Sequence, residues 1–334
     1  MGKTKRPTIT DVSKAAGVSQ TAVSQVLSGK GSFPESTRER VRKVALQLGY
    51  RPSRAAASLR TGKTRTVGIV IAGSSEPLWK SQWVGVTARI LVGAAEELHQ
   101  RNYALLVIPH DGLEMISPDL IDGVIISDSL PDDPGIDAAV AQGIPVVTND
   151  RLYDPRITIH VDSGYEEMTR VAWDLFSRRG AKRPALLTEP NLFVSDYSAE
   201  RIWRELCHQH SIEPLVRRVA FDRHDVEEGV SALIDEGADA IYSFAGEGQT
   251  VAEVVRARGR TLGSDILLLS AEMDEANQTV AAGISTIAYF AHQGGARSVK
   301  LLLDTLEGQL VPPQKVRLGY TVTEAASTPG SSSA

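Results

Sequence analysis

The chain has 334 residues, of which 42% are hydrophobic and 23% are charged, as in folded globular proteins, and this length suggests two or three domains. Its single cysteine, Cys207, excludes a disulfide framework and a cysteine-based zinc site. Because no signal-peptide-like segment or apolar run of membrane-spanning length occurs, we expect a cytoplasmic location.

The charge is unevenly distributed along the chain. The net charge is -5, yet residues 1–65 hold 14 Lys and Arg against 3 Asp and Glu, whereas the rest holds 22 against 38. A basic segment joined to an acidic body indicates that the segment meets a polyanion such as nucleic acid. The alternative is a solvated basic tail.

Residues 1–51 carry three short helical patterns. Thr8 and Asp11 have the spacing of a capping box, and Gly17 can end the helix that follows them. Ser19 can cap a second helix. Two short helices separated by a glycine turn form a helix-turn-helix, and the apolar spacing of "ESTRERVRKVALQLGY" predicts a third helix.

The second helix has an uncharged outer face that is rich in hydrogen-bonding groups. Such side chains can contact base edges when a helix lies in the major groove, while the surrounding Lys and Arg neutralise phosphates. The predicted DNA-binding residues of this segment are Thr8, Ser19, Gln20, Thr21, Ser24 and Gln25. The alternative is a three-helix interaction module whose second helix is merely polar.

Two stretches, "TITDVSKAAGVSQTAVSQVLSG" and "TRERVRKVALQLGYRPSRAAASLRTGKTRTVGIV", resemble the lactose-repressor (LacI/GalR) family of transcriptional regulators. The resemblance is dense over residues 1–70 and looser to about residue 326. It implies that Gln20, Thr21 and Gln25 read the operator. Many members have Arg or His where this chain has Gln25, so the preferred bases do not follow from the resemblance.

Residues 52–65 form an Ala-rich hinge or linker. A helix of about eight residues is marginal alone, so we expect it to order when two copies meet on DNA. Leu59 is its bulky apolar residue and would insert between base pairs in the minor groove. The residues predicted to contact DNA here are Arg54, Ala56 and Leu59. The alternative is a flexible linker with Leu59 docked on the body.

The body, residues 66–326, alternates β-branched runs with helical stretches, which predicts doubly wound parallel sheets. The strands are too many for one open sheet, so we expect two lobes. The expected strands are 66–72, 104–108, 122–127, 145–149, 157–161, 184–188, 239–244, 266–270 and 285–290. The expected helices include 82–101, 163–179, 196–210, 225–236, 247–258 and 292–307.

The predicted fold is an all-α helix-turn-helix headpiece followed by an α/β body, which the resemblance identifies as periplasmic-binding-protein-like. The resemblance places the first lobe at about 66–161 and 289–312, and the second at about 162–288 and 313–326. A disordered tail, 327–334, is expected to follow.

Ligands of such sheets bind at the carboxyl ends of the strands. The predicted effector-binding residues are Ser75, Trp79, Trp83, Ser127, Asp150, Arg201, Glu247, Glu272 and Tyr289. Carboxylates, an Arg fork and aromatic faces suit a sugar, a polyol or a nucleoside. For each of these residues taken singly, the alternative is a side chain that is solvated or paired for structural reasons.

Two of these positions depart from the family pattern. The chain has Gly246-Glu247 where members commonly show Asn-Asp, and Glu272 where an Asp is frequent. The role of Arg201 is implied by the likeness of "AERIWREL" to a family helix start. The effector is therefore not required to be a simple hexose.

The combined interpretation is a homodimeric, effector-responsive transcriptional regulator, with a repressor favoured, that binds a palindromic operator. The alternative is a body that responds to a partner protein or to no small molecule. No catalytic constellation, cofactor site or metal site is apparent, which predicts that the protein is not an enzyme. An apolar helix face could form the dimer contact or belong to the core; it comprises Val84, Ala88, Leu91, Val92 and Ala95.

Overall fold

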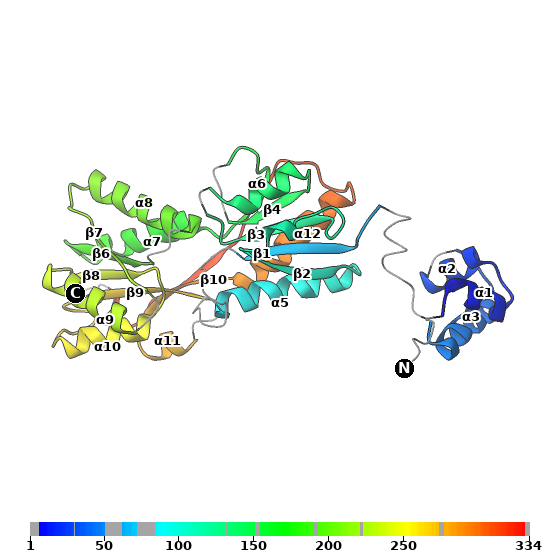
Figure 1. Ribbon diagram of the computed structural model, residues 1–334. Helices are drawn as coiled ribbons and strands as arrows, with labels where there is room; N and C mark the ends of the chain where they lie inside the picture. The colour runs from blue at the N-terminus through cyan, green and yellow to red at the C-terminus, as the bar shows by residue number, and fades with distance from the viewer. Residues whose placement is uncertain are drawn as a thin grey trace. The chain divides into compact units, whose positions relative to one another are not determined.

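The computed structural model describes residues 7–29, 31–50, 62–71, 84–130, 132–150, 154–189, 193–220, 223–273 and 277–330 (Figure 1). The chain divides into two compact units, Met1–Thr64 and Arg65–Ala334, and each is treated by itself below. Within these ranges, no helix has both the length and the apolar character needed to cross a membrane.

The first unit is a three-helix headpiece. Its helices are α1 (Ile9–Ala16), α2 (Gln20–Leu27) and α3 (Glu35–Leu48). Gly17 ends α1 in the left-handed conformation, and the Ser19 hydroxyl accepts a hydrogen bond from the Ala22 N–H at the start of α2, as predicted. The three helices share a small core built on Val12, Val23 and Val41.

The second unit contains two six-stranded sheets. The first sheet has the order β11-β5-β4-β3-β1-β2 and is parallel throughout. Its strands are β1 (Thr66–Ile71), β2 (Ala104–Pro109), β3 (Gly123–Ser127), β4 (Val146–Asn149), β5 (Ile159–Asp162) and β11 (Gln314–Arg317).

The second sheet has the order β12-β10-β9-β8-β6-β7 and is parallel except for β12, which runs antiparallel to β10. Its strands are β6 (Pro184–Thr188), β7 (Leu215–Arg218), β8 (Ala240–Ser243), β9 (Leu267–Met273), β10 (Ser285–Tyr289) and β12 (Tyr320–Thr323). The predicted architecture of two doubly wound lobes is confirmed.

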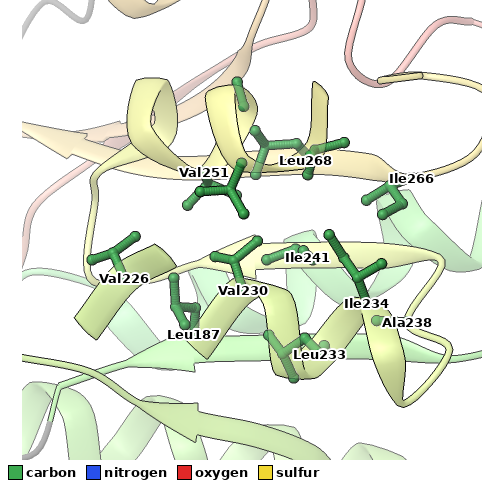
Figure 2. Packing of buried hydrophobic residues seen from close by; sticks show 14 of the residues in the cluster. Leu187, Val226, Val230, Leu233, Ile234, Ala238, Ile241, Val251, Ile266 and Leu268 are labelled. Atoms are coloured by element: carbon green, nitrogen blue, oxygen red, sulfur yellow. The ribbon is translucent and has the colours of Figure 1, made fainter. Parts of the chain in front are cut away.

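Helices cover both faces of each sheet. In the first lobe, α5 (Val84–Gln100) and α12 (Ala291–Leu306) pack on one face, and α6 (Pro134–Ala141) with the short 3-10 helix η2 (Leu113–Met115) packs on the other. In the second lobe, α7 (Tyr165–Arg178) and α8 (Val194–Gln209) share a core on one face. The opposite core lies under α9 (Arg223–Asp235) and α10 (Gly248–Ala257) (Figure 2). A short helix, α11 (Asn277–Ala281), precedes β10.

The expected lobe boundaries need correction at their last crossing. The chain leaves the first lobe after Arg317 and not at residue 312, because β11 pairs in parallel with β5 before β12 joins β10. The strands β7, β11 and β12 were not predicted. Each is an edge strand, and edge strands carry polar or charged residues that hide the apolar signal.

The predicted disorder from residue 327 onward is wrong at its first positions. Ser327 and Thr328 are fully buried. The Ser327 hydroxyl donates to the Leu268 carbonyl oxygen at 2.6 Å, and the Thr328 and Ser285 hydroxyls lie 2.6 Å apart. Residues that suggest disorder by composition are here held by hydrogen bonds to the second lobe. Residues 331–334 lie outside the described part of the chain.

Candidate functional site

In the headpiece, α2 presents a polar face because its apolar residues are used by the core. Val23 and Val26 are buried against α1 and α3, which turns Gln20, Thr21 and Gln25 outward. These three predicted reading residues are exposed, and Ser24 is half-buried. The Gln20 amide donates to the Thr10 hydroxyl at 3.1 Å, which ties the first turn of α2 to α1.

Two other predicted DNA contacts have structural tasks. The backbone N–H and the hydroxyl of Thr8 both donate to the Asp11 carboxylate, at 2.8 and 2.7 Å. Ser19 caps α2. Both residues therefore fix the start of a helix, and any contact with a phosphate would come in addition to that role.

Some of the basic residues around this face also stabilise the unit. The Arg40 guanidinium donates to the Ala16 carbonyl oxygen at 3.1 Å, at the end of α1, and Arg38 donates to Phe33 and Gly31 carbonyl oxygens. The predicted hinge contacts Arg54, Ala56 and Leu59 lie outside the described residues.

In the body, a cavity of about 200 Å³ is lined by both lobes. The first lobe supplies Val86 and Asp128, and the second lobe supplies most of the wall. The second-lobe residues are Tyr165, Glu189, Ser195, Phe244, Ala245, Gly246, Glu247, Ala271, Glu272, Met273 and Tyr289. Most of them follow or end a strand, as expected for ligand sites of parallel sheets.

Four carboxyl groups therefore line one cavity: Asp128, Glu189, Glu247 and Glu272. Glu272 accepts a hydrogen bond from the Ser270 hydroxyl at 2.8 Å, and Glu247 accepts one from the Thr250 hydroxyl at 2.8 Å. These local bonds fix two of the four carboxyls.

Two of the lining carboxyls stand on strained backbone. Asp128 has φ 51° and Glu247 has φ 58°, both in the left-handed region. Such a conformation costs of order 1–3 kcal/mol in a non-glycine residue and is found most often at functional sites. The strained backbone at Asp128 and Glu247 therefore supports this cavity as the candidate ligand site.

Burial raises the pKa of the carboxyls in and beside the cavity. It raises the pKa of Asp128 to about 6 and that of Glu189 to about 11, with repulsion from neighbouring Asp196 adding to the effect on Glu189. Burial also raises the pKa of Glu272, against the hydrogen bond from Ser270. A positive charge placed beside these groups would oppose the rise and favour their ionised forms.

Three aromatic rings flank the carboxyls. The ring of Tyr165 meets those of Phe244 and Tyr289 edge to face, with centroids 5.6 and 5.7 Å apart. All three residues line the cavity. They offer an aromatic surface beside the carboxyl groups.

The predicted effector residues are only partly brought together. Glu247, Glu272 and Tyr289 line the cavity. Ser127 does not, and it is fully buried with its hydroxyl 3.4 Å from an Asp128 carboxylate oxygen. Asp150 lines a separate small hollow near Tyr165, where burial raises its pKa. Ser75, Trp79 and Trp83 lie outside the described residues.

Arg201 is not at a helix start and does not line the cavity. Because α8 begins at Val194, Arg201 lies two turns along the helix, where its guanidinium binds Glu166 at 2.7 Å. Glu205 lies 3.6 Å away on the same helix. In this structure Arg201 is therefore paired with acids of the second lobe, and its predicted role toward an effector stays a prediction.

The sequence interpretation missed Asp128, Tyr165, Glu189, Ser195 and Phe244. A signal was present for three of them, because Asp128 and Glu189 directly follow β3 and β6, and Phe244 directly follows β8. Tyr165 and Ser195 open helices after loops, and no sequence pattern marks them. Across the residues that the structure describes, no three His, Cys, Asp or Glu side chains are placed to hold a metal ion.

Comparison with known proteins gives two family matches. Residues 8–53 match the family described as bacterial regulatory proteins, lacI family, and residues 173–328 match the periplasmic binding protein-like domain. The HTH-type transcriptional regulator CelR of Thermobifida fusca is 26% identical over 333 residues, which cover 95% of this chain and 97% of CelR.

Solved structures agree on the fold. The lac repressor dimer bound to operator and the anti-inducer ONPF has a TM-score of 0.82 at 20% identity, covering 97% of this chain and 99% of that chain. A CelR–cellobiose complex has a TM-score of 0.68 at 22% identity, covering 96% of this chain and 100% of that chain.

Proposed function

We propose, since the chain belongs to the LacI family of bacterial regulatory proteins, that this DNA-binding transcriptional regulator is a repressor that binds a palindromic operator as a homodimer and responds to a small polar metabolite. Binding DNA places it in the cytoplasm, and no catalytic role is proposed. The observation that carries the proposal is the outward set of uncharged hydrogen-bonding groups on α2.

Selection of duplexes from a random pool by the purified full-length protein tests this function. Because phosphate contacts make affinity depend on salt, the selection is run at two stated salt concentrations. We expect enrichment of a two-fold symmetric sequence at both. Recovery of duplexes without a common sequence would contradict the proposal.

Gln20→Ala is expected to relax base preference at one or two positions of each half-site, at a cost of about 1–3 kcal/mol, because a glutamine amide can bond both edge groups of adenine. Binding to a matrix of single-base operator variants measures this. Gln47→Ala is the matched control, since Gln47 is exposed on α3. Equal weakening on every operator variant would show that Gln20 does not read bases. Because Gln20→Ala also removes the hydrogen bond to Thr10, the melting temperature of the variant is measured to separate a loss of stability from a loss of base reading.

The proposed effector is a sugar, a polyol or a nucleoside bound in the cavity between the lobes. The relative CelR is known in complex with cellobiose, and a Streptococcus mutans relative, 29% identical over 187 residues, is a sucrose operon repressor. Convergence of carboxyl and aromatic groups on one cavity favours a small molecule over a partner protein. A ligand that prefers one arrangement of the lobes needs only about 1–3 kcal/mol of coupling to regulate DNA binding.

The proposed dimer contact includes one face of α5. Ala88, Val92 and Ala95 are exposed at helical spacing, whereas Leu91 packs against the core of the first lobe. The side chain of Val84 lies outside the described residues. The apolar face is therefore narrower than the sequence predicts, with Val92 as its large member.

Val92→Arg is expected to weaken the dimer at least tenfold, about 1.4 kcal/mol, because a two-fold contact would bury two unpaired charges. Sedimentation equilibrium measures the change. Val140→Arg on α6 is the matched control, since Val140 is 43% exposed and Val92 is 51% exposed. A dimer that tolerates Val92→Arg as well as Val140→Arg would move the contact away from α5.

A further inference from the structure

The carboxyl of Glu189 is buried in the cavity wall and has no partner among the residues that the structure describes. The residue is 3% exposed, directly after β6, and lines the cavity. Among the described residues, the charged groups that act on its carboxyl are Asp196 and Asp128, which are both acids. A buried acid without a donor carries a large desolvation cost that a suitable ligand could offset.

Asp128 is the second buried carboxyl, and it comes from the opposite lobe. It is 7% exposed, and the Ser127 hydroxyl donates to it at a long 3.4 Å. Glu189 and Asp128 repel each other when ionised. A ligand that neutralises both would therefore hold the two lobes together as well as fill the space between them.

The remaining described wall has acceptors and aromatic faces but no Lys, Arg or His. An anionic ligand would meet four carboxyls, and the hydroxyl donors that the described lining offers a neutral polyol are Ser195, Tyr165 and Tyr289. Aromatic faces beside carboxyls are the surroundings that favour organic ammonium groups, through cation–π attraction and charge pairing.

A metal ion fits this wall less well than an organic cation. No three of the acidic side chains in the described ranges are placed to hold one ion. The carboxyls are distributed around a cavity of about 200 Å³, which suits an extended molecule whose charged end reaches Glu189 and whose hydroxyls reach Glu247 and Glu272.

We propose that the effector is an amine-bearing polyhydroxylated molecule, of the amino-sugar type, whose ammonium group pairs with Glu189 and Asp128 in the cavity between the lobes. The inference rests on the proposed function in using this cavity as the effector site. It adds the charge of the ligand, which that function leaves open.

Titration calorimetry on the full-length protein near neutral pH, with matched sugars, tests the charge. The probes are glucosamine and galactosamine, their neutral parents glucose and galactose, N-acetylglucosamine, and the anion gluconate. We expect an amine to bind at least tenfold more tightly than its neutral parent, with no binding of gluconate. Glu189→Gln and, as a second variant, Asp128→Asn should abolish this preference. Glu114→Gln, at an exposed acid outside the cavity lining, is the control.

A proton readout separates pairing from a structural effect. Because burial raises the pKa of Glu189 to about 11, an arriving ammonium should make the group ionise and release a proton. Titration in two buffers of different ionisation enthalpy measures the release, which we expect to disappear in Glu189→Gln.

The outcomes distinguish this inference from the proposed function. Neutral sugars that bind as tightly as the amines, or an amine preference that survives Glu189→Gln, would overturn the inference and leave the function standing. Binding of no probe would overturn the inference and leave the function standing, because the panel contains no nucleoside. Amine binding without operator binding would instead overturn the function.

Discussion

Gly93→Ala is expected to destabilise the body by about 3 kcal/mol or more, although alanine normally improves a helix interior by roughly 0.5–1 kcal/mol over glycine. A Cβ at Gly93 would lie 2.0 Å from the carbonyl oxygen of His292 on α12. The obstacle is backbone, so no rotamer change can relieve it. The helices α5 and α12 would have to separate over the core that they cover.

Gly295→Ala should have a comparable effect from the other side of the same contact, because its Cβ would lie 2.1 Å from the carbonyl oxygen of Ile90. Once one variant has separated the helices, the second has less contact left to break, so the double variant should cost less than the sum.

Differential scanning calorimetry of the full chain measures these losses. Gly319→Ala is the matched control, because a Cβ there meets nothing within 4 Å and the residue lacks a positive φ. Gly93→Ala with the melting temperature of Gly319→Ala would show that α5 and α12 are not packed as closely as described.

The sequence predicts the elements of the fold where burial imposes a strong pattern. Central strands such as β1 and β3 are continuous apolar runs, since helices cover both of their faces. The edge strands β7, β11 and β12 do not follow this rule, whereas the edge strand β2 is still an apolar run. β7 reads Leu-Val-Arg-Arg and β11 reads Gln-Lys-Val-Arg, and only pairing with a neighbour identifies them.

The candidate site is predictable in its chemistry but only partly in its members. Strand ends predict Glu247 and Glu272, which line the cavity, and the same rule applied to every strand would add Asp128 and Glu189. Arg201 shows where such reasoning fails, because a motif fixes its position in the sequence but not its partner. The carboxylate of Glu166 on α7 takes its guanidinium. Which acids remain unpaired depends on packing between the lobes, and a linear pattern does not contain that information.

The buried carboxyl of Asp196 links the stability of the body to pH. Asp196 lies in the first turn of α8 and is 1% exposed. One of its oxygens accepts from the Thr188 hydroxyl at 2.9 Å, while the other is buried without a partner in the described structure. Burial raises its pKa to about 7, and the neighbouring Asp128 adds to the rise.

A raised pKa in the folded state means that the folded protein binds more protons than the unfolded chain between the two pKa values. For Asp196 this window runs from about pH 4 to about pH 7, and the free energy of unfolding contributed by this group falls as the pH rises through it. Above the window, the folded protein holds an ionised carboxylate where the surroundings favour a neutral group.

Asp196→Asn is therefore expected to stabilise the body at pH 8 by an amount of order a few kcal/mol and to change little at pH 4, where the native carboxyl is already neutral. Asparagine keeps an oxygen for the Thr188 hydroxyl and never ionises. Denaturant unfolding of both proteins across this pH range gives the difference directly, so that other titrating groups cancel. Asp119→Asn, the same change at an exposed position, should show no such dependence. A difference that is constant with pH would mean that folding leaves the pKa of Asp196 unchanged, and one that grows toward acid would mean that folding lowers it.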